Sequence, residues 1–482
     1  MDLGRDCVLI ISHDVTGPRM AGPGIRCWHL ARVLAAQLPV TLAMPSETGT
    51  SPEHVRPWPY TRGVWDSMAE AVESASAVIL AGDTLVEFPA LATCGAPLVV
   101  DGYDPHLVET LALFAGTSEG QATYRQRKSV LETQCRLGDF YVCASERQRD
   151  WWLGLLEASG RINVATYSDD PTLRRLLDVV PYGLPTSAPT HTHPVLKGVW
   201  PGIEPQDKVV LWGGGLWQWL DPLTAIQAID RVRRERPEVR LVFPGTRHPN
   251  AAVPDMPIHQ AAVELAQSLG LIDRWVFFGD WVPYERWPSL LCEADAAISL
   301  HLDTVEARLA FRSRVLDYVW AELPMVVSQG DATSELVEQY GLGLTVSFRD
   351  AQAVADALLA LLEEPERTRA SSFAAARTDL TWERAAEPLI RFCQQPAYAA
   401  DRRDEASRTS APAADVECGA TSVVEELPGG GDSRLTEIEW GGQLAARDAE
   451  VARLQALVSG YERGRFMRLM RWLSRARGGT RR

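Results

Sequence analysis

The sequence predicts an α/β protein with two Rossmann-like domains that face a shared cleft, followed by a helical tail. Three observations carry this prediction. Short apolar runs alternate with helical patterns in two successive blocks, and a proline-rich stretch separates the blocks. The chain of 482 residues, 46% of them hydrophobic, is long enough for two or three domains.

The first block predicts a parallel sheet within an N-terminal domain, residues 1–190. A helical pattern covers residues 24–38, directly after the first apolar run and a glycine-rich turn. Apolar runs of strand length, bounded by turn residues, occupy residues 7–12, 40–43, 77–80, 98–100 and 140–143.

The second block repeats this pattern and predicts a C-terminal domain, residues 205–396. We place the boundary at 186–205, after a segment in which prolines recur. The expected strands are 209–212, 240–243, 276–278, 296–300, 325–327 and 344–346. The expected helices are 222–235, 257–269, 284–293, 308–321, 332–339, 351–363 and 382–394.

Beyond the second block, the composition changes twice. Residues 397–433 are rich in Ala, Ser, Gly, Asp and Glu, which predicts a disordered linker. Residues 434–482 predict a basic amphipathic helical tail, in which Phe466, Leu469, Met470 and Leu473 share one helix face. This tail fits an anionic membrane surface, and docking onto a partner helix is the alternative.

Charge and cysteine usage restrict the partners and the compartment. The net charge is −15, but residues 462–482 hold eight Arg and one Glu, so residues 1–461 carry −15 − 7 = −22. Such a body repels nucleic acid, whereas the segment 462–482 attracts anions. Eight cysteines show no metal-ligand spacing, and no signal peptide or run of about 18 apolar residues is present. We expect a cytoplasmic protein, peripheral on the inner face of the membrane, without a metal.

Two glycine-rich loops follow the first strand of each block. The first contains Gly22, Pro23, Gly24 and Arg26, and opens a helix whose amides can face a phosphate or an acceptor. The second contains Gly213, Gly214 and Gly215, which predicts close contact with a phosphate or a hexose. Neither loop reads G-x-G-x-x-G, so no dinucleotide cofactor is indicated.

A charged segment between two expected strands supplies acids and arginines. Carboxylates accept hydrogen bonds from sugar or ribose hydroxyls, and guanidinium groups match phosphates. A solvated helix face with the same charges is the alternative interpretation. The residues concerned are Glu306, Arg308, Arg312, Arg314 and Asp317, with Arg247 in a separate loop after a strand.

These motifs resemble the retaining glycosyltransferases of family 4, which have the two-domain GT-B fold. The resemblance covers about residues 7–395 and rests on the loops 22–26 and 213–215, on Phe278-Gly279, on the run 292–299 and on the run 316–327. By this resemblance Asp317 contacts the nucleotide ribose. The family's usual second acid corresponds to Leu309 here, which makes Glu306 the substitute. The family's basic pair near the glycine loop is also absent.

The charge for a diphosphate must therefore come from other arginines. The candidates are Arg247, Arg308, Arg312 and Arg314, with Arg312 preferred because it precedes Asp317 by five residues. In the family a histidine of the N-terminal domain touches the donor sugar. His106 takes that role here, with His13 as the competitor, and Asp104 orders the turn before Pro105.

The expected function follows from the resemblance. It is the retaining, metal-independent transfer of a hexose from a nucleotide-diphosphate sugar, which is substrate rather than cofactor, to a glycan or lipid-linked acceptor. Two alternatives stay open: a sugar-nucleotide epimerase or phosphorylase with the same fold, and a non-catalytic scaffold of a glycan assembly complex.

Overall fold

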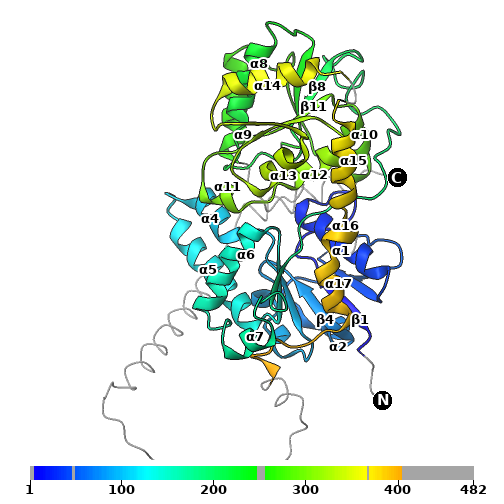
Figure 1. Ribbon diagram of the computed structural model, residues 1–482, viewed down its shortest axis with the longest axis vertical. Helices are drawn as coiled ribbons and strands as arrows, with labels where there is room; N and C mark the ends of the chain where they lie inside the picture. Colours follow the sequence, from blue (N-terminus) through cyan, green and yellow to red (C-terminus); the bar gives the residue numbers. More distant parts are fainter. Residues whose placement is uncertain (1–4, 46–48, 247–255, 366–367, 404–482) are drawn as a thin grey trace, which may run out of the picture. The chain divides into compact units, whose positions relative to one another are not determined.

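The computed structural model describes residues 5–45, 49–246, 256–365 and 368–403, and contains two parallel sheets with helices packed on them (Figure 1). Both sheets belong to one compact unit. This arrangement confirms the predicted fold class for the two domains.

The first sheet has seven strands in the order β3-β2-β1-β4-β5-β6-β7. Every pair is parallel. Its strands are β1 Cys7–Ile11, β2 Val40–Met44, β3 Arg56–Pro59, β4 Ala75–Leu80, β5 Leu98–Asp101, β6 Phe140–Cys143 and β7 Leu177–Val179.

The second sheet has six parallel strands in the order β10-β9-β8-β11-β12-β13, the doubly wound order of a Rossmann fold. Its strands are β8 Lys208–Leu211, β9 Val239–Pro244, β10 Val276–Gly279, β11 Ala296–Ser299, β12 Met325–Ser328 and β13 Gly343–Val346.

Helices connect the strands of both sheets. In the first half these are α1 Gly22–Ala35, η1 Trp65–Ser67, α2 Ala69–Glu73, α3 Thr84–Glu87, η2 Pro89–Thr93, α4 His106–Phe114, α5 Gly120–Leu137, α6 Glu146–Ala158 and α7 Val164–Asp169. In the second half they are α8 Pro222–Val232, α9 Pro257–Ser268, η3 Tyr284–Arg286, α10 Trp287–Cys292, α11 Val305–Leu309, α12 Ser313–Trp320, α13 Ala332–Tyr340, α14 Ala351–Glu363, α15 Ala370–Asp379, α16 Trp382–Ala385 and α17 Glu387–Gln394.

Every predicted strand is present, and the prediction missed two others. Both lie at the edges of the first sheet. β3 reads R-P-W-P and is largely exposed, so it lacks the apolar run that marks a strand, and prolines are tolerated there because an edge strand needs fewer donors. β7 has only three residues.

The predicted helix 308–321 is wrong. The chain forms two shorter helices instead, α11 and α12, joined through residues 310–312. The Thr304 side chain caps α11 by accepting from Ala307 N at 3.1 Å, and Ala310 ends it with an extended backbone. The expected helix 382–394 is likewise divided, into α16 and α17, with Ala386 between them.

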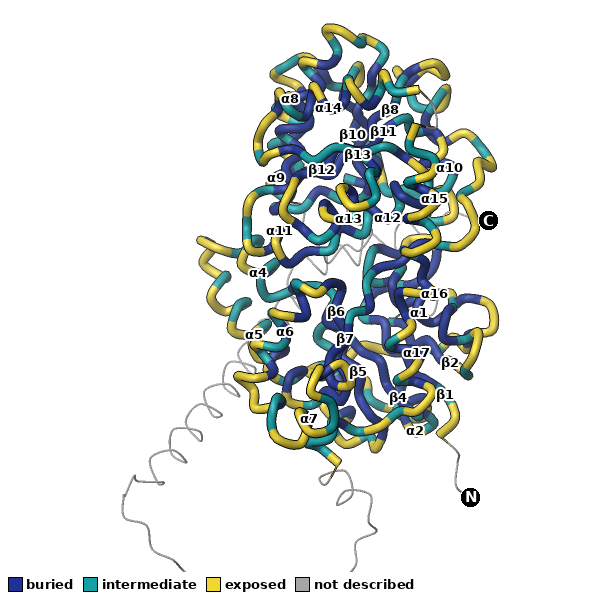
Figure 2. Tube along the Cα trace, viewed as in Figure 1, coloured by how far each residue is buried: buried dark blue, intermediate teal, exposed yellow. Residues whose placement is uncertain are grey.

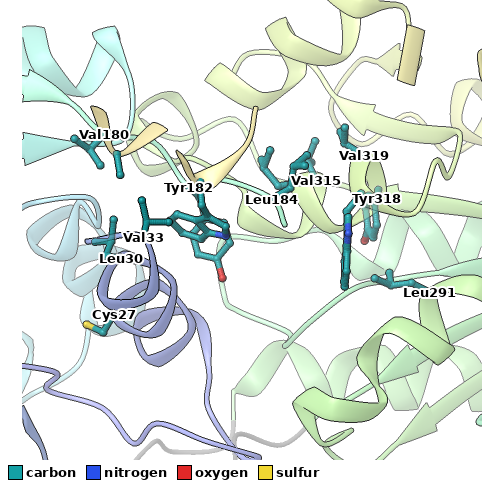
Figure 3. Close-up of a cluster of buried hydrophobic side chains, with 14 of the residues drawn as sticks. Cys27, Leu30, Val33, Val180, Tyr182, Leu184, Leu291, Val315, Tyr318 and Val319 are labelled. Carbon is teal, nitrogen blue, oxygen red and sulfur yellow. The ribbon is translucent and has the colours of Figure 1, made fainter. Parts of the chain in front are cut away.

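A hydrophobic core continues from one sheet to the other through the connecting segment. Tyr182 and Leu184 of that segment lie between Leu30 of α1 and Val315 of α12, and all four side chains are buried (Figure 3). Leu184 N donates to Leu380 O at 2.9 Å, so the start of α16 lies beside this segment. Most strand residues of both sheets are buried, while many exposed residues lie on the outer helices and loops (Figure 2).

Residues 397–403 pack against the first sheet, which corrects the start of the expected linker. Ala399 N donates to Asp139 Oδ1 at 3.1 Å, and Arg161 and Asp401 form an ion pair at 2.6 Å with both side chains largely buried. The rest of that linker, 404–433, and the tail, 434–482, lie outside the described residues. Within the described part of the chain, no helix combines the length and the apolar character needed to cross a bilayer.

Candidate functional site

Strand order locates the ligand edge of each sheet. In the first sheet, the order reverses between β1 and β4, and in the second between β8 and β11. Ligands of open parallel sheets bind beyond the carboxyl ends of the strands at such reversal points. The loops after β1 and β8 contain the two predicted glycine motifs, so both motifs lie where the topology favours binding.

The loop after β8 is held against α12 by Tyr318. Gly213 N donates to the Tyr318 hydroxyl at 2.7 Å, and that hydroxyl donates to Ile298 O at 3.0 Å. A Cβ atom at Gly213 would lie 3.0 Å from the tyrosine ring. Gly214 has φ +80°, which L side chains rarely adopt. Packing against Tyr318 therefore favours glycine at 213, and the backbone conformation favours it at 214.

Arg314 of α12 contacts this loop, and among the described residues no acid forms an ion pair with it. Its Nη2 donates to Gly215 O at 3.0 Å, and its guanidinium carbon lies 5.4 Å from the centroid of the Trp212 ring. Nη1 is shielded from solvent and has no hydrogen-bond partner within the described residues. Burial lowers the pKa of Arg314 to about 10, and the charges of Tyr318 and Asp317 only partly oppose this.

A second donor beside the same loop lacks an acceptor. Trp212 is fully buried, and its Nε1 has no partner in the described part of the chain. Buried donors are nearly always hydrogen-bonded in folded proteins. Two such donors next to one glycine loop indicate a place where a polar or anionic group belongs.

Asp317 lies one turn after Arg314 on α12, on the same helix face. Its Oδ2 accepts from Trp287 Nε1 at 3.0 Å. Burial raises the pKa of Asp317 to about 7, and the hydrogen bond from Trp287 and the charge of Arg314 only partly oppose this. A half-buried carboxyl with lone pairs to spare is suited to accept hydrogen bonds from hydroxyl groups.

Glu306 and Arg312 form a closed, buried ion pair. Arg312 Nη1 and Nη2 each donate to one Glu306 oxygen at 2.8 Å, and Glu306 is 1% exposed. Asp331 adds a third group, 3.5 Å from Arg312 Nε, and His301 Nε2 lies 3.3 Å from the same carboxylate. Burial opposes the charge of Arg312, but the two acids outweigh it and raise its pKa.

This pairing changes the expected roles of both residues. The Arg312 fork, preferred from sequence as the diphosphate ligand, is already occupied by Glu306. Glu306 in turn has no exposed oxygen with which to touch a sugar. The geometry therefore favours Arg314 over Arg312 as the phosphate ligand and makes Glu306 a support of the loop between α11 and α12.

Of the two remaining predicted arginines of this domain, the structure describes Arg308. Arg308 lies on α11, on a different helix from Arg314 and Asp317, and its side chain is exposed. Arg247 lies outside the described residues.

In the first domain, the loop 22–26 is shaped by close packing. A Cβ atom at Gly24 would lie 2.3 Å from Val15 O, so the start of α1 requires glycine there. Gly22 faces the Tyr103 hydroxyl, and Pro23 stands in the first turn of α1.

Arg26 corrects a prediction for this loop. It is 1% exposed and forms a two-pronged ion pair with Asp101, at 2.6 and 2.9 Å. It also donates to Val180 O at 2.9 Å and Pro181 O at 3.1 Å. Four of the five guanidinium N–H groups are thus used, so Arg26 joins β5 to the connecting segment and is not available to an acceptor or a phosphate.

His106 begins α4, just beyond β5, and His13 follows β1. Burial lowers the pKa of both imidazoles, so both are neutral at neutral pH. His106 Nε2 and His13 Nδ1 are shielded and lack partners within the described residues. Asp104 lies two residues before His106, and its backbone oxygen accepts from His106 N at 2.8 Å. Burial raises the pKa of the Asp104 carboxyl to about 7.

Sequence reasoning missed two residues that shape this site. Tyr318 was detectable, because it is four residues from Arg314 and therefore close to it on one helix. Trp287 was not, because it is 30 residues from Asp317 and no local pattern links them. No group of three or more His, Cys, Asp or Glu in the described residues has the arrangement of a metal site.

Comparisons with known proteins agree with this geometry. Residues 207–364 match the family model described as "Glycosyl transferases group 1", and this segment contains all six strands of the second sheet. No curated protein matches the chain.

Solved structures match both sheets. Sucrose-phosphate synthase from Thermosynechococcus elongatus has 14% sequence identity and a TM-score of 0.52, over 81% of this chain and 98% of its own. HepE from Anabaena, in complex with UDP-glucose, has 13% identity and a TM-score of 0.52, over 84% and 99%. A glycosyltransferase from Rickettsia africae has 13% identity and a TM-score of 0.54, over 81% and 99%.

These matches show the fold of GT-B glycosyltransferases. The family model marks the second domain as a glycosyltransferase domain, and the chain is accordingly a glycosyltransferase.

Proposed function

We propose that this enzyme transfers a hexose, with retention of configuration and without a metal, from a nucleotide-diphosphate sugar to a glycan or lipid-linked acceptor. The observation that carries the proposal is the uncompensated Arg314 guanidinium beneath Gly213–Gly215. HepE, whose structure contains UDP-glucose, supports the class of sugar donor.

Arg314 fits a diphosphate for three reasons. Its free Nη1 has donors to offer, and its place at the ligand edge of β8 meets the backbone of the glycine loop. An anion there would offset the burial that lowers the Arg314 pKa. An arginine fork also matches phosphate oxygens better than a lysine would.

Asp317 fits the ribose of the same nucleotide. Arg314 and Asp317 lie about 5–6 Å apart at Cβ because they are three residues apart on α12. A nucleotide diphosphate presents its ribose hydroxyls and its phosphates at a comparable separation. Trp287 fixes one carboxyl oxygen of Asp317 and leaves lone pairs for the ribose.

The proposed reaction requires no nucleophile from the protein. The bond between sugar C1 and the β-phosphate oxygen breaks, and the bond between C1 and the acceptor oxygen forms on the same face. The acceptor proton passes to the β-phosphate, which leaves as the nucleotide diphosphate. Arg314 and the first amides of α12 stabilise the leaving charge, and removing one such donor typically costs about 10²–10³ in kcat.

His106 and the loop 22–24 are assigned to sugar and acceptor recognition. A neutral imidazole offers one donor and one acceptor, which suits a hydroxyl group. For a lipid-linked acceptor, the basic segment 462–482 would hold the enzyme at an anionic membrane face. This part of the proposal rests on the sequence, because the segment lies outside the described residues.

A thermal-shift panel with UDP, GDP, ADP and dTDP tests the proposal, followed by assays with the matching nucleotide sugar. We expect one diphosphate to stabilise the enzyme, and Arg314→Gln to weaken its binding about 10–150-fold, the equivalent of a charge-assisted hydrogen bond of about 1.5–3 kcal/mol. Arg274→Gln is the matched control, because Arg274 is exposed and precedes β10 at the opposite edge of the sheet.

The outcomes separate the alternatives. Stabilisation by no diphosphate would reject the assignment. Conversion of the nucleotide sugar without any acceptor would indicate an epimerase, and release of the sugar phosphate would indicate a phosphorylase. Formation of a glycoside with the same anomeric configuration as the sugar donor would support a retaining transferase.

A further inference from the structure

Gln148 is a buried amide whose hydrogen bonds reach both domains. It is 1% exposed, and its Nε2 donates to Tyr103 O at 2.8 Å in the first domain. The same Nε2 donates to Leu309 O at 2.8 Å in the second domain. Its Oε1 accepts from Ala144 N at 2.7 Å. All these groups are main-chain atoms, so the contacts depend on where the backbone runs.

The orientation of this amide is fixed by its partners. An exchange of Oε1 and Nε2 would place oxygen against two carbonyl groups and nitrogen against an N–H. The backbone of Gln148 is also held in place. Its N–H donates to the hydroxyl of Ser145, the N-cap residue of α6, at 3.2 Å. The first turn of α6 therefore fixes the direction in which the Gln148 side chain points.

The two carbonyls that Gln148 joins belong to the two segments that bear site residues. Tyr103 O lies in the segment from β5 to His106 at the start of α4. Leu309 O ends α11, the helix of Glu306, and precedes the turn to Arg312. Leu309 O is one of the terminal carbonyls that a helix cannot satisfy by itself, and Gln148 satisfies it from the other domain.

Arg147 makes a parallel connection at the surface. It donates to Gly330 O and pairs with Glu335 of α13. Gly330 precedes Asp331, the carboxylate beside Arg312. Two consecutive residues of α6 thus contact both main-chain segments that enclose the Glu306–Arg312 pair.

We propose that Gln148 is a positioning residue that joins the His106 segment of the first domain to the Leu309–Arg312 turn of the second. Its amide holds these segments at the separation at which the sugar donor, bound by the second domain, meets groups of the first. The proposal rests on the proposed function for its kinetic consequences. Its structural consequence, joint ordering of the two segments, is independent of that function.

Gln148→Met tests this role, because methionine has a similar length and no strong hydrogen-bonding group. Gln134→Met is the matched control. Gln134 is also 1% exposed in the first domain, but its Nε2 donates to a single carbonyl, Gly82 O at 2.9 Å, in the same domain. Both substitutions remove a buried amide, so both lower stability, but only the first breaks a connection between domains.

Three measurements on the full chain distinguish positioning from general stability. In steady-state assays with the best nucleotide sugar, we expect kcat of Gln148→Met to fall at least 10-fold, with nucleotide-diphosphate affinity within about 3-fold of wild type. Hydrogen exchange should quicken in both 103–106 and 309–312. Gln134→Met should keep kcat within about 3-fold and leave exchange at 309–312 unchanged.

Equal loss of kcat in both variants, or unchanged exchange at 309–312 in Gln148→Met, would overturn the proposal. If Gln148→Met does not fold, Arg147→Ala supplies a milder test, since its contacts are partly exposed, and exchange at 330–335 replaces that at 309–312. If the wild type binds no nucleotide diphosphate, the proposed function fails, while hydrogen exchange still decides the connection.

Discussion

Arg314→Met is the substitution with the most distinctive expected result, because it should stabilise the free enzyme and weaken ligand binding. Burial lowers the pKa of Arg314 to about 10. A free guanidinium has a pKa about 2.5 units higher, and each unit corresponds to about 1.4 kcal/mol, so burial of this charge costs about 3.5 kcal/mol in the ligand-free protein. Methionine retains the apolar contacts without the charge.

Two favourable contacts reduce the expected gain. The hydrogen bond to Gly215 O contributes about 1 kcal/mol, and the contact with the Trp212 ring contributes about 0.5–1 kcal/mol. The net stabilisation is therefore about 1.5–2 kcal/mol. In the wild type, a nucleotide diphosphate at 100 times its Kd adds about 2.7 kcal/mol, and the variant should lose most of this increment.

Chemical denaturation with and without the nucleotide diphosphate measures both effects. The variant should have the higher urea midpoint without ligand and the lower one with saturating ligand. A variant that is less stable without ligand would refute the claim that the charge is uncompensated. A variant with an undiminished ligand increment would refute the claim that Arg314 holds the phosphate.

Three further predictions concern the buried charges. Glu306→Leu leaves Arg312 as a buried cation and should lower the free energy of unfolding, measured with urea, by about 3–5 kcal/mol. Glu306→Leu combined with Arg312→Met should recover most of this loss. Similar losses in the single and the double variant would contradict a closed ion pair. Burial raises the pKa of Asp317 from 3.8 to about 7, so the contribution of Asp317 to stability falls as pH rises from about 4 to 7. The variant Asp317→Asn should not show this decline. An identical dependence of stability on pH in the two proteins would count against burial of Asp317 as the cause. Burial is the main reason that the pKa of His29 is lowered to about 3, so stability should fall as pH decreases below about 6.5, by up to about 1.4 kcal/mol per pH unit. His29→Phe, which can still stack on Trp382, should reduce this dependence in urea titrations at successive pH values. An unchanged dependence would show that His29 is not the titrating group.

Local pattern predicted the sheets and the glycine loops because their signals are local. A buried strand inside a parallel sheet appears in the sequence as a run of apolar residues. A tight loop at the carboxyl end of such a strand appears as a cluster of glycines. The edge strands β3 and β7 escaped detection because one is rich in proline and exposed and the other is three residues long.

The break between α11 and α12 was not predictable from the same signals. Ala310, Phe311 and Arg312 include no glycine or proline, so the helical pattern reads as continuous. In a continuous helix, residues six apart point in different directions. The break turns the chain so that Arg312 reaches Glu306, and this tertiary pairing changes the role of both residues.

Pairing across the sheet explains the error at Arg26. Its partner Asp101 is 75 residues away and becomes its neighbour only when β5 takes its place in the sheet. Arg314 shows the complementary case. The sequence predicted it together with three other arginines, and the lack of an ion pair within the described residues distinguishes it from the buried Arg312. The sequence shows which residues carry a charge, but it does not show which of these charges are paired in the fold.

The most direct test of the central claim is a crystal structure of the enzyme with its best-binding nucleotide diphosphate. The account predicts a phosphate oxygen at about 2.7–2.9 Å from Arg314 Nη1, next to Gly213–Gly215, and ribose hydroxyls on Asp317. A nucleotide bound away from the loop after β8, with Arg314 Nη1 still without a partner, would contradict it.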